Sequence, residues 1–160
     1  MIRPCTTADA AAVCGIYNHY VRKTVITFEE VPVPTVEMAQ RILDVTARFP
    51  WLVAEEGDVI VGYAYAAPWK ARSAYRFSVE TTVYVAPNHL GRGIGTALYR
   101  GLLDALRKLD VHCAVGGIAL PNAASIALHE NLGFKNIGQF VEIGRKFDRW
   151  IDVGYWELIF

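Results

Sequence analysis

The segment His89–Thr96 has the residue types of a phosphate-binding loop. Glycine stands at every second position from Gly91 to Gly95, between a segment with strand character and one with helix character. Glycine has no Cβ, so the main chain of such a loop can approach a ligand closely. The following helix offers unpaired N–H groups and a partial positive charge, which favour phosphate or pyrophosphate, and Arg92 would add a cationic contact. The pattern predicts either an anion site or a tight connection without a ligand.

Two familiar nucleotide-binding motifs are disfavoured by the spacing of this loop. The dinucleotide fingerprint requires G-x-G-x-x-G and an acidic residue at the end of the second strand. This chain has G-x-G-x-G instead, and residues 119–122, where its second strand is expected to end, include no acidic residue. A P-loop requires G-K-[ST], which does not follow Gly95.

Periodicity predicts the elements that would position the loop. Strands are expected at residues 2–5, 51–54, 59–67, 77–86 and 112–120, and helices from Thr6 or Thr7 to Tyr20 and at residues 36–49, 94–109 and 122–132. Residues 135–160 are expected to form two antiparallel strands connected by residues 144–149. Since no repeat or linker interrupts the pattern, residues 1–160 are expected to form a single α/β or α+β domain.

Composition excludes several classes of protein. Hydrophobic residues make up 53% of the 160 residues and charged residues 20%, which excludes disorder and low complexity. Sixteen basic residues balance sixteen acidic ones, so neither nucleic acid nor an anionic membrane is an expected partner. The uncharged stretch 111–129 contains Gly116–Gly117 and Pro121, so it predicts strand, loop and helix rather than a membrane span. The histidines and cysteines lack metal-ligand spacing, so no metal is expected, and the absence of an apolar leader predicts a cytoplasmic location.

A second motif follows the loop at Asn122–Phe134, with Asn, then Ser three residues later, and Gly-Phe at its end. The pair resembles the two signature regions of the GNAT acyltransferase superfamily, which bind acetyl-CoA. Residues 69–75, 79–85 and 144–154 resemble the W-x-x-R-x-A-Y, V-E-x-T-V-Y-V and G-x-K-x-x-x-W-x-D-V-G segments of phosphinothricin and methionine sulfoximine N-acetyltransferases. One departure is Leu90, where the family usually has Arg or Gln in contact with the cofactor.

The resemblance implies a GNAT fold, a central mixed and mostly antiparallel sheet with splayed parallel middle strands, flanked by helices. It implies direct transfer of acetyl from acetyl-CoA to a primary amine. Main-chain groups of Val83, Tyr84 and Val85 would pair with the pantetheine arm, and an N–H near Val85 would polarise the thioester carbonyl. The other implied cofactor-binding residues are Gly91, Arg92, Gly93, Ile94, Gly95 and Thr96 for the pyrophosphate, and Asn122 and Ser125 for the pantetheine arm.

By the same resemblance, Glu80 is the general base and His129 the acid or a proton relay. Glu80 is the only charged residue of the segment 77–88. If it is desolvated, its pKa rises towards neutrality, which suits removal of a proton from an ammonium. His129 stands where many GNAT relatives have Tyr, and an imidazole can donate a proton near pH 7. The alternatives are that Glu80 is an ordinary exposed carboxylate of a strand and that His129 is a structural residue.

The resemblance also implies an acceptor pocket that includes the loop formed by residues 70–76. Its expected members are Phe28, Lys70, Ala71, Arg72, Tyr75, Arg76, Glu80, Thr81 and Thr82, with Trp69 in its apolar wall. Arginines can bind a carboxylate or phosphinate bidentately, so the expected acceptor is a small amino acid analogue such as phosphinothricin, methionine sulfoximine or methionine sulfone. Thr81 and Thr82 point to opposite faces of a regular strand, so both would contact the acceptor only at a bulge.

Other functions remain open from the sequence. A GNAT enzyme with this cofactor site could act on a polyamine, an antibiotic or a protein N-terminus, and an acidic acceptor groove would favour polyamines or peptides. A CoA-binding module without transfer would keep the glycine loop but would not need Glu80 and His129 together. A homodimer is expected because relatives are commonly dimeric, and the aromatic residues of the last two strands would serve an interface or the core.

Overall fold

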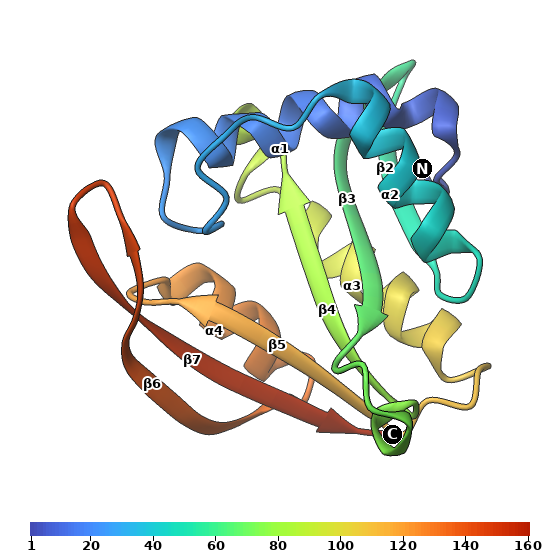
Figure 1. Cartoon of the computed structure of the whole chain (residues 1–160). Coiled ribbons are helices and arrows are strands. Elements are labelled where there is room, and N and C mark those ends of the chain that lie inside the picture. The colour runs from blue at the N-terminus through green and yellow to red at the C-terminus, as the bar shows by residue number, and fades with distance from the viewer.

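Figure 1 shows the computed structural model, which describes residues 1–160, as one twisted sheet with helices on both faces. The seven strands lie in the order β1-β2-β3-β4-β5-β7-β6. The strands are β1 (Ile2–Pro4), β2 (Trp51–Glu56), β3 (Val59–Pro68), β4 (Ser78–Val85), β5 (Cys113–Ala119), β6 (Lys135–Lys146) and β7 (Arg149–Ile159). The helices are α1 (Ala10–Lys23), α2 (Thr35–Thr46), α3 (Ile94–Leu106) and α4 (Ala123–Asn131).

Helices α1 and α2 cover one face of the sheet, and α3 and α4 cover the other. In α3, Leu98, Leu102 and Leu106 recur at helical spacing and are fully buried. They pack in the same cluster as Ala64 and Ala66 of β3, whose small side chains let the helix lie close to the sheet. None of the helices has the length and apolar character needed to cross a membrane.

The feature that positions the site is the divergence of β4 and β5, the only parallel pair of the sheet. Their pairing begins at Ser78 with Cys113 and ends at Glu80 with Val115. Beyond Glu80, β4 continues to Val85 without a partner on that side, and the two strands separate visibly in Figure 1. The predicted mixed sheet with splayed parallel middle strands is thereby confirmed.

All predicted elements are present, although several ends differ. The connection between the last two strands is shorter than the predicted residues 144–149. Only Phe147 and Asp148 separate β6 from β7. Both turn residues have positive φ angles, of 51° and 57°, which allow this tight reversal. The first helix begins at Ala10, after a 3-10 turn, and continues three residues past the predicted end at Tyr20.

Candidate active site

A cleft follows the opening between β4 and β5. It consists of two adjoining cavities, an inner one of about 290 Å³ that includes Glu80 and an outer one of about 370 Å³ that includes the glycine loop. The two cavities share five lining residues, so they form one continuous space. The shared residues are Ile26, Val83, Tyr84, Asn122 and Ser125.

The main chain of β4 presents unpaired groups to this cleft. The Ala86 N–H donates to the Val61 carbonyl (2.8 Å), so even-numbered residues here turn their main-chain groups towards β3. Val83 and Val85 consequently turn theirs towards the opening, beyond the last pair with β5. The Tyr20 hydroxyl donates to the Val85 carbonyl (2.5 Å). The N–H groups of Val83 and Val85 and the Val83 carbonyl therefore remain available to a ligand.

Tyr84 differs from its two neighbours. It is opposite Tyr63 in the β3–β4 ladder, and its main-chain groups point to that strand rather than to the cleft. Its ring packs against Tyr17, Tyr20 and Tyr63, with centroids 5.0 to 5.6 Å apart. The prediction that the Tyr84 main chain pairs with a ligand is therefore wrong in this geometry, and its ring lines the cleft instead.

The glycine loop has the backbone that its composition predicted. Gly91 and Gly93 have φ angles of +73° and +77°, which residues other than glycine rarely adopt. No atom of the surrounding protein lies within 4 Å of the position that a Cβ would take at either residue. The first hydrogen bond of the loop–helix junction runs from the Ala97 N–H to the Gly93 carbonyl (3.0 Å). The N–H groups of residues 94–96 thus have no helical partner, and these residues line the outer cavity.

Arg92 does not join the loop's other residues at the cavity. Its guanidinium lies 3.1 Å from the Glu56 carboxylate, and it is absent from the lining of the cleft. Asn122 lies as predicted at the start of α4, where its Oδ1 accepts a hydrogen bond from the Ser125 N–H (3.1 Å). This bond orients the Asn122 side chain, whose amide nitrogen has no partner in the protein and can donate into the cleft.

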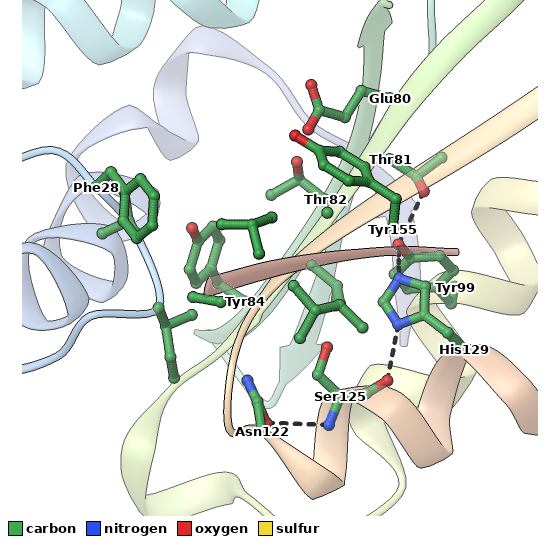
Figure 2. Close-up of a pocket in the computed structure, with 17 residues that line it drawn as sticks. Phe28, Glu80, Thr81, Thr82, Tyr84, Tyr99, Asn122, Ser125, His129 and Tyr155 are labelled. Carbon is green, nitrogen blue, oxygen red and sulfur yellow. Dashed lines mark hydrogen bonds between the residues drawn. The ribbon is translucent and has the colours of Figure 1, made fainter. Parts of the chain in front are cut away.

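Glu80 marks the inner end of the cleft, at the point where β4 and β5 separate (Figure 2). Burial raises the pKa of Glu80 above its usual range, and the Lys70 ammonium partly opposes that rise. The Tyr155 ring stands beside the carboxylate, and burial and the Glu80 charge together raise the pKa of its hydroxyl. A half-buried carboxylate with a raised pKa is the type of group that acts as a base near neutral pH.

His129 belongs to a hydrogen-bonded chain on the other face of β4 (Figure 2). Its Nδ1 lies 2.8 Å from the Ser125 carbonyl, and its Nε2 lies 2.9 Å from the Tyr99 hydroxyl, which lies 2.8 Å from Thr81 Oγ1. Since a carbonyl can only accept, Nδ1 carries the hydrogen and Nε2 accepts from Tyr99. Burial lowers the pKa of His129, so the neutral ring is favoured. This arrangement disfavours direct proton donation by an imidazolium.

Two consecutive glycines of β5 accommodate these two groups. A Cβ at Gly116 would overlap the His129 ring. A Cβ at Gly117 would lie 3.4 Å from Glu80 Oε1 and 3.2 Å from the Tyr155 ring. Paired glycines inside a strand often mark close approach of other groups, and that signal was present in the sequence.

The predicted acceptor residues separate into two groups. Phe28, Thr81 and Thr82 line the inner cavity with Glu80, and β4 has no bulge, so the two threonines face opposite sides of the sheet. Trp69 and Tyr75 line a neighbouring cavity of about 520 Å³, which Tyr155 separates from the cleft. The remaining predicted residues are exposed and line neither cavity: Lys70, Ala71, Arg72 and Arg76.

The model of the acetyltransferase (GNAT) domain matches residues 2–154. The chain belongs to the GNAT acetyltransferase family. It is an N-acetyltransferase by this membership, and the splayed strands and the glycine loop are the structural counterparts of the match.

Known GNAT proteins resemble the chain over nearly its full length. The phosphinothricin N-acetyltransferase of Streptomyces viridochromogenes is 44% identical over 156 residues, 98% of this chain and 85% of that protein. The L-methionine sulfoximine/L-methionine sulfone acetyltransferase of Salmonella typhimurium is 40% identical over 161 residues, 98% of this chain and 92% of that protein. The crystal structure of a phosphinothricin acetyltransferase from Sinorhizobium meliloti, in complex with AcCoA, has a TM-score of 0.96 and 35% identity, covering 99% of this chain and 87% of that chain.

Two residues that line the inner cavity were not among the site residues predicted from the sequence. Tyr99 of α3 connects Thr81 to His129 and is fully buried. Tyr155 of β7 stands between the inner cavity and the neighbouring aromatic one. Neither lies in a glycine or carboxylate motif, and both are aromatic residues in apolar elements, where core packing is the ordinary interpretation.

Proposed function

We propose that this GNAT enzyme transfers the acetyl group of acetyl-CoA to the amino group of a small amino acid analogue of the phosphinothricin, methionine sulfoximine or methionine sulfone type. The observation that carries the proposal is the continuous cleft from the glycine loop to Glu80. One end suits a diphosphate, and the other places a half-buried carboxylate where an amine would have to lose a proton. The acceptors named for the two relatives supply the substrate class.

The residues of the cleft fit acetyl-CoA, which supplies the acetyl group as a thioester when bound. The free N–H groups of residues 94–96 would hold the diphosphate. The free main-chain groups of Val83 and Val85 would pair with the amides of the pantetheine arm, as an added strand does. The Asn122 amide, oriented by its bond to the Ser125 N–H, would donate to the same arm.

Glu80 acts as the base in this mechanism. An amine at neutral pH carries an extra proton and cannot attack a thioester until it loses that proton. Because burial raises the pKa of Glu80, the carboxylate is a stronger base than an exposed glutamate.

His129 acts as a positioning group through Tyr99. The neutral ring holds its proton on Nδ1, against the Ser125 carbonyl, and accepts the Tyr99 O–H at Nε2. The Tyr99 hydroxyl is thereby fixed between His129 and Thr81, both of which line the inner cavity. Because the one hydrogen of the neutral ring is held by the Ser125 carbonyl, this chain supplies no proton, and the leaving thiolate would take up the proton that Glu80 removes from the amine.

The acceptor is anionic in this proposal because the loop beside the cleft carries unbalanced positive charge. Lys70, Arg72 and Arg76 form no ion pair with any carboxylate of the chain. Lys70 is close enough to Glu80 to lower its pKa against the effect of burial. A carboxylate or phosphinate on the acceptor would complement these cations, whereas a polycationic polyamine would be repelled.

The assembly we propose is a homodimer formed through the β6–β7 hairpin. β6 is an edge strand, and seven large apolar residues of the hairpin are more than half exposed. They are Ile137, Phe140, Val141, Ile143, Phe147, Trp150 and Ile159. A long apolar edge of this kind is normally covered in the functional protein.

A panel of acceptors with acetyl-CoA, followed by release of free thiol, tests the proposed function. Phosphinothricin and methionine sulfone should release thiol in proportion to acceptor, whereas spermidine, an aminoglycoside and a peptide should not. If the enzyme prefers one of the last three acceptors, the proposed class of amino acid analogues is wrong. Stabilisation by CoA with no acceptor-dependent thiol release would indicate a binding module instead.

A further inference from the structure

The loop between α1 and α2, residues 24–34, forms one wall of the inner cavity through Ile26, Thr27 and Phe28. On the helix side it is well anchored. The Tyr17 hydroxyl lies 2.8 Å from Thr27 Oγ1, and the Asn18 side chain bonds both the N–H and the carbonyl of Val33, at 2.8 and 2.9 Å. These bonds hold the loop to α1, which covers the N-terminal half of the sheet.

On the opposite side, the loop has one side-chain hydrogen bond to the β6–β7 hairpin. Lys146, the last residue of β6, donates from Nζ to the Thr27 carbonyl (2.8 Å), across 119 positions of the sequence. Next to this bond, the Phe28 ring packs so closely on Gly144 that a Cβ there would overlap it. The loop therefore connects the two halves of the sheet across the open side of the cleft.

Burying a lysine at position 146 carries a desolvation cost. The Lys146 side chain is 2% exposed, yet its ammonium has three donors and only one hydrogen bond, with the Phe147 ring 5.2 Å away. Burial lowers the pKa of Lys146, and Glu29 and Glu30 oppose that effect. An apolar side chain of similar length would remove the desolvation cost. Folding stability alone therefore does not explain a lysine here.

We propose that Lys146 is a positioning residue for acceptor binding, which holds the Thr27–Phe28 wall across the splayed sheet opposite Glu80. This inference rests on the proposed function, because it assigns the wall to the acceptor. The cofactor side of the cleft lies on β4, α3 and α4, and Lys146 contacts none of these elements through a hydrogen bond. Loss of the tether should affect the acceptor much more than acetyl-CoA.

Steady-state kinetics of Lys146→Met tests whether the KM for the acceptor changes more than the KM for acetyl-CoA. We expect the KM for phosphinothricin to rise about tenfold, with the KM for acetyl-CoA within about twofold of wild type and no fall in Tm. Lys135→Met removes an exposed lysine from the same strand and should change none of these values. Unchanged KM values in Lys146→Met, or equal rises in both with a lower Tm, would overturn the inference.

Two further measurements keep the test decisive. Gly144→Ala displaces Phe28 without touching Lys146 and should give the same selective rise in acceptor KM, so it replaces Lys146→Met if that variant fails to fold. Hydrogen–deuterium exchange of residues 24–34 needs no acceptor. Exchange should be faster in the loop of whichever variant folds and unchanged in α1. Unchanged exchange in the loop contradicts the tether, whereas the absence of acetylation by wild type contradicts only the proposed function.

Discussion

At the scale of single residues, the site depends on groups whose charge states are set by burial. Glu80 and His129 lie at the same opening of the sheet, and burial shifts their pKa values in opposite directions. Each shift favours the neutral form of its group. Each therefore also makes the stability of the fold depend on pH, in a direction that can be calculated.

For His129 the dependence lies on the acid side. The folded-state pKa is below the usual value of 6.5, so the unfolded chain takes up a proton first as the pH falls. The contribution is fully present above pH 6.5 and is lost as the pH falls below it. Urea unfolding between pH 5 and 8 should show this loss in wild type and in His112→Gln, an exposed control. A profile of His129→Gln identical to wild type would show that His129 does not contribute.

The two β5 glycines predict a second effect at this scale. Gly116→Ala places a methyl group inside the His129 ring contact, which should lower the free energy of unfolding by about 1–3 kcal/mol and displace the ring. Gly15→Ala in α1 has nothing within 4 Å of the new methyl and should be stabilising by about 0.5–1 kcal/mol. Chemical denaturation measures both, and a neutral Gly116→Ala would mean that β5 can shift to admit the side chain.

At the scale of elements, the anion site that we propose at the start of α3 has no side-chain contact from position 90, where the family usually has Arg or Gln. Leu90 is 58% exposed at the mouth of the outer cavity. Leu90→Arg should lower the KM for acetyl-CoA about two- to fivefold, the range of an exposed ion pair, and the gain should shrink at high salt. Leu109→Arg, three residues beyond the opposite end of α3, is the matched control and should leave KM unchanged. A salt-independent change in KM would indicate a cause other than charge.

The sequence predicted these elements well where one local signal decided them. Alternation in residues 77–86 predicted β4, and the glycine spacing predicted a loop whose φ angles require glycine. Helix and strand ends were displaced by up to four residues where capping and turns decided them, as at Ala10 and at the Phe147–Asp148 turn. These features depend on single residues rather than on a period.

Contacts between distant elements could not be predicted in the same way. The ion pair between Arg92 and Glu56 depends on how the β2–β3 turn meets the glycine loop. Tyr99, Tyr155 and Lys146 acquire their roles only when α3, β7 and β6 are placed around the opening. No periodic or spacing signal in one segment records a partner in another.

At the scale of the whole molecule, the exposed β6–β7 hairpin predicts the oligomeric state. Sedimentation velocity should show a dimer for wild type. The Phe140→Ser, Ile143→Ser double variant should sediment as a monomer because it removes two large exposed apolar side chains of the edge strand. Val36→Ser, which changes an exposed apolar residue of α2, should remain dimeric. A monomeric wild-type protein would contradict the assembly.

The central claim is that Glu80 removes the proton from the acceptor's amino group. The direct measurement is the rate at which acetylated phosphinothricin forms from acetyl-CoA, for wild type and Glu80→Gln across pH 6–9. We expect kcat to fall by about 10²–10⁴ in the variant, with a Tm no lower than wild type at pH 8 because a buried charge is removed. Wild-type rates in Glu80→Gln throughout that pH range would contradict it.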